Sequence, residues 1–354
     1  MCGIAGYFGV NPPNLARQQA AGESIRSRGP DGQGIYSNAH QSGFSVALIH
    51  RRLAIIDRNV RSDQPFRLGN KILIFNGEIY NYLELRKILK SLGYQFSTSG
   101  DTEVLAYCLE EWGHDAVDRL EGMWAFAWYD EKTGSLLLSR DRFGEKPLYF
   151  WRRENGFFFA SEVKGLAALA GTWPAVNKNH LLRYLINGYK SLYKVSETFF
   201  CEVEEVPPGI NLFLDCDGVE HKNKYWNPKL AVKNEMSHQD ATEMTRRAIL
   251  DSVRLRVRSD VPVGFCMSGG LDSNTLIAVA SRELGLDPHG FTIVNTDERY
   301  EEIDIVNQVV SELGLKHTSV YLEKCDFIEN LKKLVRAHDS PVYTISYYLH
   351  WQLM

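Results

Sequence analysis

The first half of the chain carries short runs of apolar residues, many of them alternating with polar ones, which is typical of β-strands. Turn residues separate the runs, as at 28–34 (RGPDGQG) and 130–134 (DEKTG). Because few runs are separated by a helical pattern, stacked and mostly antiparallel sheets covered by helices are favoured over a Rossmann unit. The predicted strands include 3–8, 44–56, 71–77, 124–130, 135–141, 147–152 and 157–162.

Two helical patterns interrupt these strands, at 82–93 and 100–113. In the second pattern Asp101 is a candidate N-cap, and Gly113 is expected to end the helix. After the strands, the segment 206–226 is predicted to form a hairpin or short strands between two domains.

The pattern changes from about residue 236, where strands and helices begin to alternate along the chain. This alternation predicts a parallel, doubly wound sheet. The apolar run 261–267 is expected to be a buried strand. The predicted order is helix 241–257, strand 261–267, helix 274–285, strand 290–295, helix 300–315 and strand 317–322.

Length and composition narrow the class of protein. The 354 residues are enough for two domains of ~100–200 residues each. A hydrophobic content of 44% and a charged content of 24% are ordinary for a soluble globular protein, and a formal charge of -4 offers no basic field to nucleic acid. No apolar run approaches the ~18–20 residues that span a bilayer, and no secretory signal is visible. Neither a nucleic-acid nor a membrane partner is expected.

Cysteine usage fits a reducing, cytoplasmic compartment. The six cysteines include no CxxC pair, which in a chain this long argues against a disulfide framework and a zinc site. They are Cys2, Cys108, Cys201, Cys216, Cys266 and Cys325.

A glycine-rich turn joins the predicted strand 261–267 to the next helix. In SGGLDS (268–273) the two glycines permit a tight turn, the helix directs its free N–H groups at that turn, and the serines add hydroxyl donors. The segment is not a Walker A loop, since no GK[ST] follows. These features favour a phosphate-binding loop over a turn that only tightens a strand–helix joint.

Cys2 stands next to the N-terminus and is followed by Gly3. Removal of Met1 would leave a cysteine with both a thiol and a free α-amine, whose unperturbed pKa is ~7.7–8.0. The amine could then accept the thiol proton, directly or through water, so that nucleophile and base come in one residue. Alternatively, Cys2 merely starts the first strand, and position alone favours that interpretation.

Seven segments, taken together and in this order, resemble the glutamine-hydrolysing asparagine synthetases, and the resemblance covers essentially the whole chain. They are MCGIAGYFG (1–9), RGPDG (28–32), HRRLAIID (50–57), FNGEIYN (75–81), SGDTEVL (99–105), RDRFGEKPLYF (140–150) and SGGLDS (268–273).

The resemblance implies two domains of different fold class. The first is an α+β class II glutamine amidotransferase domain of the Ntn type, a four-layer αββα sandwich at 2–185. A connecting hairpin or linker follows at 186–235. The stretch 236–354 is the N-terminal part of an α/β parallel-sheet synthetase domain, similar to the N-type ATP pyrophosphatases and adenine nucleotide α-hydrolases.

The resemblance also implies roles for residues of the first domain. Cys2 attacks the side-chain amide of glutamine, and Asn76 and Gly77 donate hydrogen bonds to the oxyanion. Arg52 pairs with the substrate α-carboxylate. Glu78 and Asp101 bind the α-ammonium. The implied glutamine-binding residues are Arg52, Leu53, Ala54, Ile55, Ile56, Asn76, Gly77, Glu78 and Asp101.

Each role has a local alternative. Arg52 could be a surface strand residue, Asn76-Gly77 a hairpin turn and Asp101 a helix cap. Arg51 competes with Arg52, and because strand residues alternate in direction only one of the two can face the pocket. The resemblance selects Arg52. The residues expected to order loops are Arg28, Asp31, Arg140, Asp141 and Arg142.

In the second domain the resemblance implies an ATP site on the glycine-rich loop and the next strand. Asp272 would either help to hold Mg²⁺ or cap the following helix, and both options stay open. The implied ATP-binding residues are Met267, Ser268, Gly269, Gly270, Leu271, Asp272, Ser273 and Ile293.

The implied reaction converts L-aspartate, L-glutamine and ATP into L-asparagine, L-glutamate, AMP and pyrophosphate through β-aspartyl-AMP. The alternatives are a relative that amidates another carboxylate, and a glutaminase or nucleotide-binding remnant without synthetase activity. The family pattern continues beyond residue 354 with a second glycine- and acid-rich loop, so the second domain is expected to be C-terminally truncated. Glutamine, aspartate and ATP are the expected partners, and a homodimer is one option for the assembly.

Overall fold

The computed structural model describes residues 1–194, 196–228, 235–294, 302–321 and 326–354. The chain divides into two compact units, 1–229 and 230–354. The predicted domain bounds at 185 and 235 stay a prediction, although strands of the segment 186–235 pair into the sheets of the first unit.

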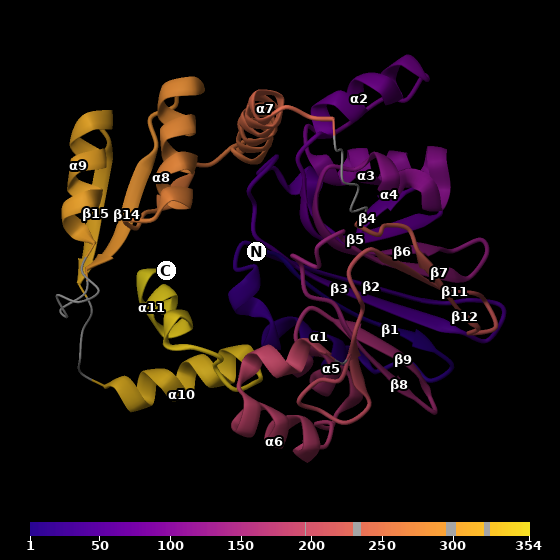
Figure 1. Cartoon of the computed structure of the whole chain (residues 1–354). Coiled ribbons are helices and arrows are strands. Elements are labelled where there is room, and N and C mark those ends of the chain that lie inside the picture. Colours follow the sequence, from indigo (N-terminus) through magenta and orange to yellow (C-terminus); the bar gives the residue numbers. More distant parts are fainter. Residues whose placement is uncertain (195, 229–234, 295–301, 322–325) are drawn as a thin grey trace. The chain divides into compact units, whose positions relative to one another are not determined.

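Two six-stranded antiparallel sheets build the first unit (Figure 1). The first sheet has the order β10 (Val203–Glu205), β8 (Tyr149–Arg153), β9 (Gly156–Ala160), β1 (Gly3–Gly9), β3 (Ser45–Arg52), β2 (Gly32–Ala39). The second has the order β12 (Glu220–Lys224), β11 (Ile210–Leu214), β7 (Ser135–Arg140), β6 (Gly122–Asp130), β5 (Lys71–Ile79), β4 (Phe66–Leu68).

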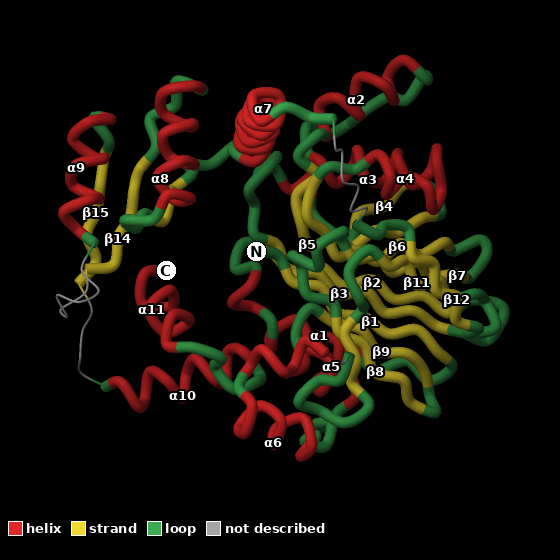
Figure 2. Tube along the Cα trace, in the orientation of Figure 1, coloured by secondary structure: helices red, strands yellow, loops and turns green. Residues whose placement is uncertain are grey.

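Helices cover the outer face of each sheet, as Figure 2 shows. The helices of this unit are α1 (Leu15–Ser24), α2 (Tyr82–Ser91), α3 (Asp101–Trp112), α4 (Ala116–Arg119), α5 (Val163–Ala170) and α6 (Lys178–Asn187). Short 3₁₀ turns lie at Arg26–Arg28, Val60–Ser62, Gly113–Asp115 and Tyr189–Lys194. Helices α1 and α5 pack on the first sheet, and α2, α3 and α4 pack on the second.

Strand alternation explains the four layers. On β3, Val46 and Leu48 belong to the apolar cluster between the two sheets, whereas Ala47 and Ile49 belong to the cluster under α1 and α5. Both faces of such a strand are buried, so its sequence is an almost continuous apolar run rather than an alternating one. The order is therefore helices, sheet, sheet, helices, and the predicted αββα sandwich is confirmed.

Several predicted details of the first unit are wrong. The strand predicted at 44–56 ends at Arg52, whose carbonyl accepts the N–H of Asp31, and the chain then leaves the sheet. The N-cap of α3 is Gly100 rather than Asp101. The sequence patterns also miss α1, α5, α6 and β2. The polar surface of α1 (LARQQAAGES) and the two glycines of half-buried β2 (GQGIYSNA) weaken the apolar signal there.

The second unit contains a parallel sheet in the order β13 (Gly264–Cys266), β14 (His289–Val294), β15 (Lys316–Tyr321). Its helices are α7 (His238–Arg256), α8 (Leu271–Ala278), α9 (Ile303–Leu313), α10 (Phe327–His338) and α11 (Ile345–Leu353), with a π-helical turn at Val279–Glu283. The alternation of strand and helix and the parallel pairing are as predicted. The predicted boundaries at 295, 300 and 322 lie outside the described residues, as does Cys325.

One prediction for this unit is wrong. The strand at 261–267 was expected to be buried, yet Gly264 and Cys266 of β13 are exposed. The buried apolar residues of this unit's cluster are Met267, Ile277 and Val306, which lie after the strand and on the helices. Within the described ranges, no helix has the length and apolar character needed to cross a membrane.

Candidate active site

Cys2 lies at the edge of the first sheet, immediately before β1. Because β1 pairs with β3 and Gly3 faces Arg51, the start of the chain lies beside the end of β3. Leu53, the first residue after β3, donates its N–H to Cys2 Sγ at 3.3 Å. The Cys2 thiol in turn donates to the Leu53 carbonyl at 3.6 Å.

Two basic side chains approach the start of the chain. Arg28 donates from Nε to the Cys2 carbonyl oxygen at 2.9 Å and pairs with Glu162 at 3.0 Å. Lys146, buried, places Nζ 3.0 Å from the sulfur of Met1. The sequence predicts Arg28 only as a loop-ordering residue and does not single out Lys146. The only sequence feature that could have pointed to Arg28 and Lys146 is that they lie within the RGPDG and RDRFGEKPLYF segments, respectively.

The surroundings of Cys2 favour the protonated form of its thiol. Burial raises its pKa, and the carboxylates of Glu78 and Asp101 add to that effect. The hydrogen bond from Leu53 and the nearby terminal ammonium act in the opposite direction. A thiol with a raised pKa needs a base before it can attack a carbonyl carbon.

The terminal amine beside Cys2 has the opposite shift. In this structure it belongs to Met1, and burial lowers its pKa, with the positive charges of Arg28 and Lys146 acting in the same direction. The thiolate of Cys2 and the carboxylate of Glu78 act against that lowering. An amine held at this place therefore loses its proton more readily than an amine in water.

The outer edge of β5 presents backbone donors next to this region. The N–H of Phe75 donates to Gln64 Oε1 at 2.6 Å, and the N–H of Ile79 donates to Asp101 Oδ2 at 2.9 Å. Since N–H groups alternate along a strand, that of Gly77 points to the same edge, between these two. No side-chain or loop acceptor for the Gly77 N–H is found among the described residues.

Asn76 lies inside β5, opposite Ala125 of β6, so the alternative of a hairpin turn at Asn76-Gly77 is wrong. Its side chain is completely buried, and neither Nδ2 nor Oδ1 has a hydrogen-bond partner among the described residues. A buried amide without partners costs about 1–3 kcal/mol, so such a group is usually kept for a purpose.

Arg51 and Arg52 leave β3 in opposite directions, as strand alternation requires. Arg51 donates to the Gly22 carbonyl at 2.8 Å and pairs with Glu23 of α1. Arg52 donates to the carbonyl oxygens of Asp57 and Asn59 and pairs with Asp63. Of the two arginines, Arg52 is therefore the one directed to the side of the loop that follows β3.

Asp101 begins α3, and burial raises the pKa of its carboxyl to about 6. The N–H groups of Ile79, Asp101 and Thr102 and the charge of Arg52 counteract this effect in part. The structure thus brings Asp101 within electrostatic range of both Arg52 and Cys2.

Ala54, Ile55 and Ile56, which follow Leu53, have different surroundings. The N–H of Ala54 donates to Asp31 Oδ2 at 2.8 Å. Ile56 is buried in the cluster beneath α2 and α3, and Ile55 packs against that cluster. The side chain of Ile56 therefore belongs to the core rather than to an open slot.

The loop-ordering prediction for Arg140, Asp141 and Arg142 is confirmed. The carboxylate of Asp141 accepts the backbone N–H groups of Trp124, Phe143, Glu145 and Lys146 at 2.9–3.2 Å. Arg140 donates to the carbonyl oxygens of Gly144, Lys146 and Val206, and Arg142 donates to that of Leu120. These bonds fix the backbone from which Lys146 projects.

In the second unit the glycine-rich loop connects β13 to α8. The Ser268 and Ser273 hydroxyls lie 3.0 Å apart, and Gly270, the N-cap of α8, donates its N–H to Ser268 Oγ. The N–H of Gly269 donates to a carboxylate oxygen of Glu302 at 2.7 Å. The loop therefore already binds an anionic group through its backbone.

Asp272 lies exposed in the first turn of α8 and makes no capping hydrogen bond, so the alternative of a helix cap is wrong. Met267 is buried, and its N–H donates to the Phe291 carbonyl of β14 at 2.8 Å. Ile293 lies on β14, half-buried. No cluster of three or more potential metal-ligating side chains occurs in the part of the chain that the structure describes.

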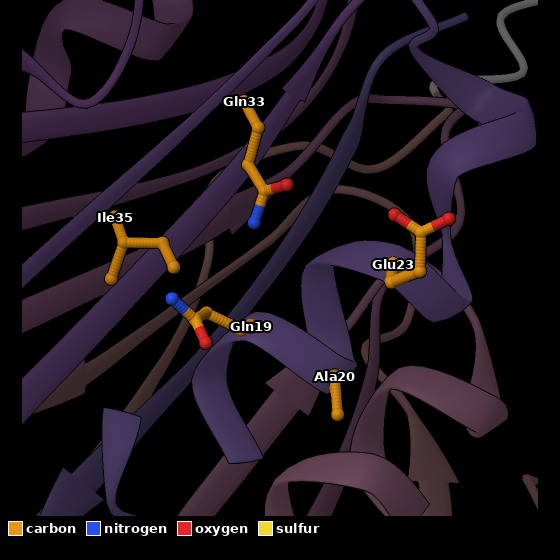
Figure 3. A pocket seen from close by; sticks show the side chains of 5 residues that line it. All are labelled: Gln19, Ala20, Glu23, Gln33 and Ile35. Atoms are coloured by element: carbon orange, nitrogen blue, oxygen red, sulfur yellow. The ribbon is translucent and has the colours of Figure 1, made fainter. Parts of the chain in front are cut away.

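A hollow of about 600 Å³ lies elsewhere on the first unit, between α1 and β2 (Figure 3). None of the predicted site residues lines it; its lining is Gln19, Ala20, Glu23, Gln33 and Ile35. Glu23 is the ion-pair partner of Arg51.

Comparison with known families decides the membership of the chain. The model of the glutamine amidotransferase domain matches residues 1–226, and that of asparagine synthase matches residues 244–354. The chain belongs to the glutamine-hydrolysing asparagine synthetase family. Its sandwich is thus the Ntn amidotransferase fold, and the small parallel sheet after it lies in the asparagine synthase match.

Two asparagine synthetases are similar to the chain over nearly its whole length. A protein of Methanocaldococcus jannaschii named as a glutamine-hydrolysing asparagine synthetase is 32% identical, over 96% of this chain and 68% of its own length. Asparagine synthetase 1 of Bacillus subtilis is 33% identical, over 97% of this chain and 53% of its own length. A solved glutamine PRPP amidotransferase from B. subtilis aligns over 91% of each chain with a TM-score of 0.49 and 17% identity. The chain spans between about half and two thirds of the length of these two synthetases.

Proposed function

We propose that the chain catalyses glutamine-dependent asparagine synthesis, in which the first unit releases ammonia from glutamine and the second activates aspartate with ATP. The observation that carries the proposal is the position of Cys2. Its thiol lies where β1 begins and β3 ends, within electrostatic range of the carboxylates of Glu78 and Asp101. Asp101 is in turn within electrostatic range of the Arg52 guanidinium, so charges of both signs are available for a zwitterionic amino acid.

The proposed nucleophile and base are the thiol and α-amine of Cys2. Removal of Met1 would place the free amine of Cys2 near the surroundings that lower the pKa of the present terminal amine, and such surroundings favour the neutral form that can accept a proton. The sulfur attacks the amide carbon of glutamine while the amine takes the thiol proton. The carbon–nitrogen bond then breaks, the proton leaves with ammonia, and water hydrolyses the γ-glutamyl thioester to glutamate.

Asn76 and Gly77 are the proposed oxyanion donors. The buried Asn76 amide without partners and the outward N–H of Gly77 are what a developing negative charge requires. Both belong to one strand, and Gln64 and Asp101 fix that strand on either side of them.

Arg52, Glu78 and Asp101 are the proposed ligands of the amino-acid end of glutamine. Arg52 uses three of its five N–H groups on Asp57, Asn59 and Asp63, which leaves donors for a carboxylate. Glu78 and Asp101 would bind the α-ammonium. Leu53, Ala54, Ile55 and Ile56 would contribute through the backbone that connects Arg52 to Asp57.

The proposed ATP site is the loop after β13, with Met267 and Ile293 beside the adenosine and 268–273 around the pyrophosphate. The hydrogen bond from the Gly269 N–H to the Glu302 carboxylate supports an anion-binding role for this loop. The exposed carboxylate of Asp272 suits Mg²⁺, which is usually held by one or two carboxylates together with substrate phosphates. Bound there, Mg²⁺ would neutralise phosphate charge.

In the proposed second half-reaction the aspartate side chain attacks the α-phosphate of ATP, which releases pyrophosphate and gives β-aspartyl-AMP. Ammonia then displaces AMP and yields asparagine. A cytoplasmic location and a homodimer remain predictions that accompany this proposal.

The deciding experiment is mass spectrometry of the N-terminus after treatment with a glutamine-like chloroketone. Label on an N-terminal Cys2, with loss of glutamine hydrolysis in Cys2→Ala, supports the glutaminase proposal. An intact Met1 and label on another residue contradict it. AMP formation then tests the second half: dependence on aspartate supports asparagine synthesis, another acceptor indicates a different amidation, and no ATP cleavage indicates a remnant.

A further inference from the structure

Asp57 ends the HRRLAIID segment and has an unusual backbone conformation. Its φ is 46°, in the left-handed region that few residues other than glycine adopt, asparagine and aspartate being the most frequent of these. Only 5% of the residue is exposed. Such strain persists only where the surroundings over-determine it, and it often marks a functional region.

The carboxylate of Asp57 joins two segments that are distant in sequence. Oδ2 accepts the N–H of Ser99 at 2.7 Å and Nε of Arg61 at 3.1 Å, and Oδ1 accepts the N–H of Asn59 at 3.3 Å. Gly100, the N-cap of α3, packs on the same side chain, since a Cβ there would lie 3.3 Å from the Asp57 Cβ.

The carbonyl of Asp57 accepts a hydrogen bond from the guanidinium of Arg52. One residue therefore contacts both Arg52 and the two residues that precede Asp101. Arg52 and Asp101 are the groups of opposite charge that, under the proposed function, bind the α-carboxylate and the α-ammonium of glutamine.

We propose that Asp57 is a positioning residue that sets the separation of Arg52 and Asp101 and thereby the affinity of the site for an α-amino acid. This inference rests on the proposed glutaminase function. It assigns to Asp57 no contact with the reacting atoms, so its effect falls on binding rather than on the chemistry at Cys2.

The primary variant is Asp57→Asn, because asparagine tolerates the left-handed conformation and keeps the side-chain shape. Loss of a charge-assisted hydrogen-bond network is expected to raise KM for glutamine about tenfold. The value of kcat should change less than about threefold, since Asp57 contacts neither Cys2 and Leu53 nor the proposed donors Asn76 and Gly77.

Two electrophiles distinguish a specific loss of amino-acid binding from a general disturbance of the structure around Cys2. A glutamine-like chloroketone carries the amino-acid group, and at subsaturating concentration it should label Asp57→Asn about tenfold more slowly than the wild type. Iodoacetamide lacks that group and should label both proteins at the same rate. Equal slowing with both reagents would overturn the inference.

A second variant disturbs the contact between Asp57 and Gly100 by changing Gly100. Gly100→Ala keeps an ordinary backbone conformation but pushes a methyl group against Asp57, 3.3 Å away, and Ser62, 3.4 Å away. We expect the same direction of change in KM. The matched control is Asp130→Asn, whose carboxylate also accepts backbone N–H groups, those of Lys132 and Thr133, in the turn after β6. It should leave KM unchanged.

The outcomes distinguish this inference from the proposed function. If Cys2→Ala still hydrolyses glutamine, the proposed function fails. If Cys2 is essential but Asp57→Asn and Gly100→Ala both bind glutamine as the wild type does, only the role of Asp57 fails. Should Asp57→Asn not fold, Gly100→Ala and the pair of electrophiles still give the decision.

Discussion

Leu53 holds the sulfur of Cys2 through both of its backbone groups, with the N–H at 3.3 Å and the carbonyl at 3.6 Å. The contact uses no side-chain atom of Leu53, so it depends on the β1–β3 pairing that sets Gly3 opposite Arg51. The thiol is therefore positioned by the register of a sheet, which is more rigid than a loop.

Asn76→Ala is expected to separate activity from stability. Removal of the amide should lower kcat for glutamine hydrolysis ~10²–10³-fold with little change in KM, because the donor acts only in the transition state. The free energy of unfolding should not fall, since the amide has no partner to lose. Steady-state kinetics and denaturant titration measure the two effects.

Gln64→Ala is the control for that experiment. Gln64 is also buried, but it bonds to the Phe75 N–H at 2.6 Å and to Thr102 at 3.3 Å. Its removal should lower the free energy of unfolding by about 1–3 kcal/mol. If Asn76→Ala destabilises the protein as much as Gln64→Ala does, the amide of Asn76 is structural and its role in the oxyanion site is wrong.

Gly77→Ala should damage the strand itself. A Cβ at this position would lie 2.0 Å from the carbonyl oxygen of Met123 and 2.7 Å from the ring of Phe75. Because β6 backbone cannot yield easily, we expect a loss of about 1–3 kcal/mol in the free energy of unfolding and a lower kcat. Gly93→Ala provides a comparison, since nothing lies within 4 Å of its Cβ position, although its φ of 100° adds strain of its own. Because alanine keeps the backbone N–H, a kcat equal to that of the wild type would contradict the expected displacement of this donor.

The sequence predicts much of the fold because β-strands buried on both faces leave long apolar runs, as at β3 and β6. The prediction fails where an element has few apolar residues or is stabilised mainly by packing against its neighbours. The α1 helix buries Gln18 and Gly22 rather than large side chains, so its sequence shows no clear apolar stripe. The opposite error occurs at β13, where an apolar run is exposed in the folded unit.

The candidate site likewise has residues that the sequence motifs indicate and residues that they do not. The resemblance of the motifs, rather than residue type alone, selects Cys2, Arg52 and Asp101 as candidates, and each carries chemistry that the proposed reaction requires. The residues that position these candidates cannot be identified from the motifs. Asp57 acts through a left-handed backbone and a bond to Ser99, 42 residues away, and such long-range contacts have no periodic signature in one sequence.

Asp101 predicts a pH dependence of glutamine binding. Burial raises the pKa of its carboxyl to about 6. Since the anion is the form that binds an ammonium, KM for glutamine should rise as the pH falls through 6. Asp101→Asn should have a high KM without this inflection. A wild-type KM that is flat from pH 7 to pH 5 would argue against Asp101 as the ammonium ligand.

The same shift has a stability consequence of defined sign. A carboxyl whose pKa is higher in the folded than in the unfolded state, where it is near ~3.9, binds protons more tightly when folded. Its contribution to stability is therefore present at low pH and is lost as the pH rises through about 6. Asp101→Asn should remove that component of the pH dependence of unfolding.

His50 predicts a contribution of the opposite sign. Burial lowers the pKa of this completely buried imidazole to about 3, helped by the charge of Arg52 and opposed by the hydrogen bond to the Phe75 carbonyl at 3.1 Å. The unfolded chain, with a histidine pKa near ~6.5, binds the proton more readily. The folded state should therefore lose stability as the pH falls from 6.5 towards 3. His50→Gln, which can still donate to Phe75, should flatten this part of the unfolding profile measured by denaturant titration, whereas an unchanged acid slope would show that His50 does not govern it.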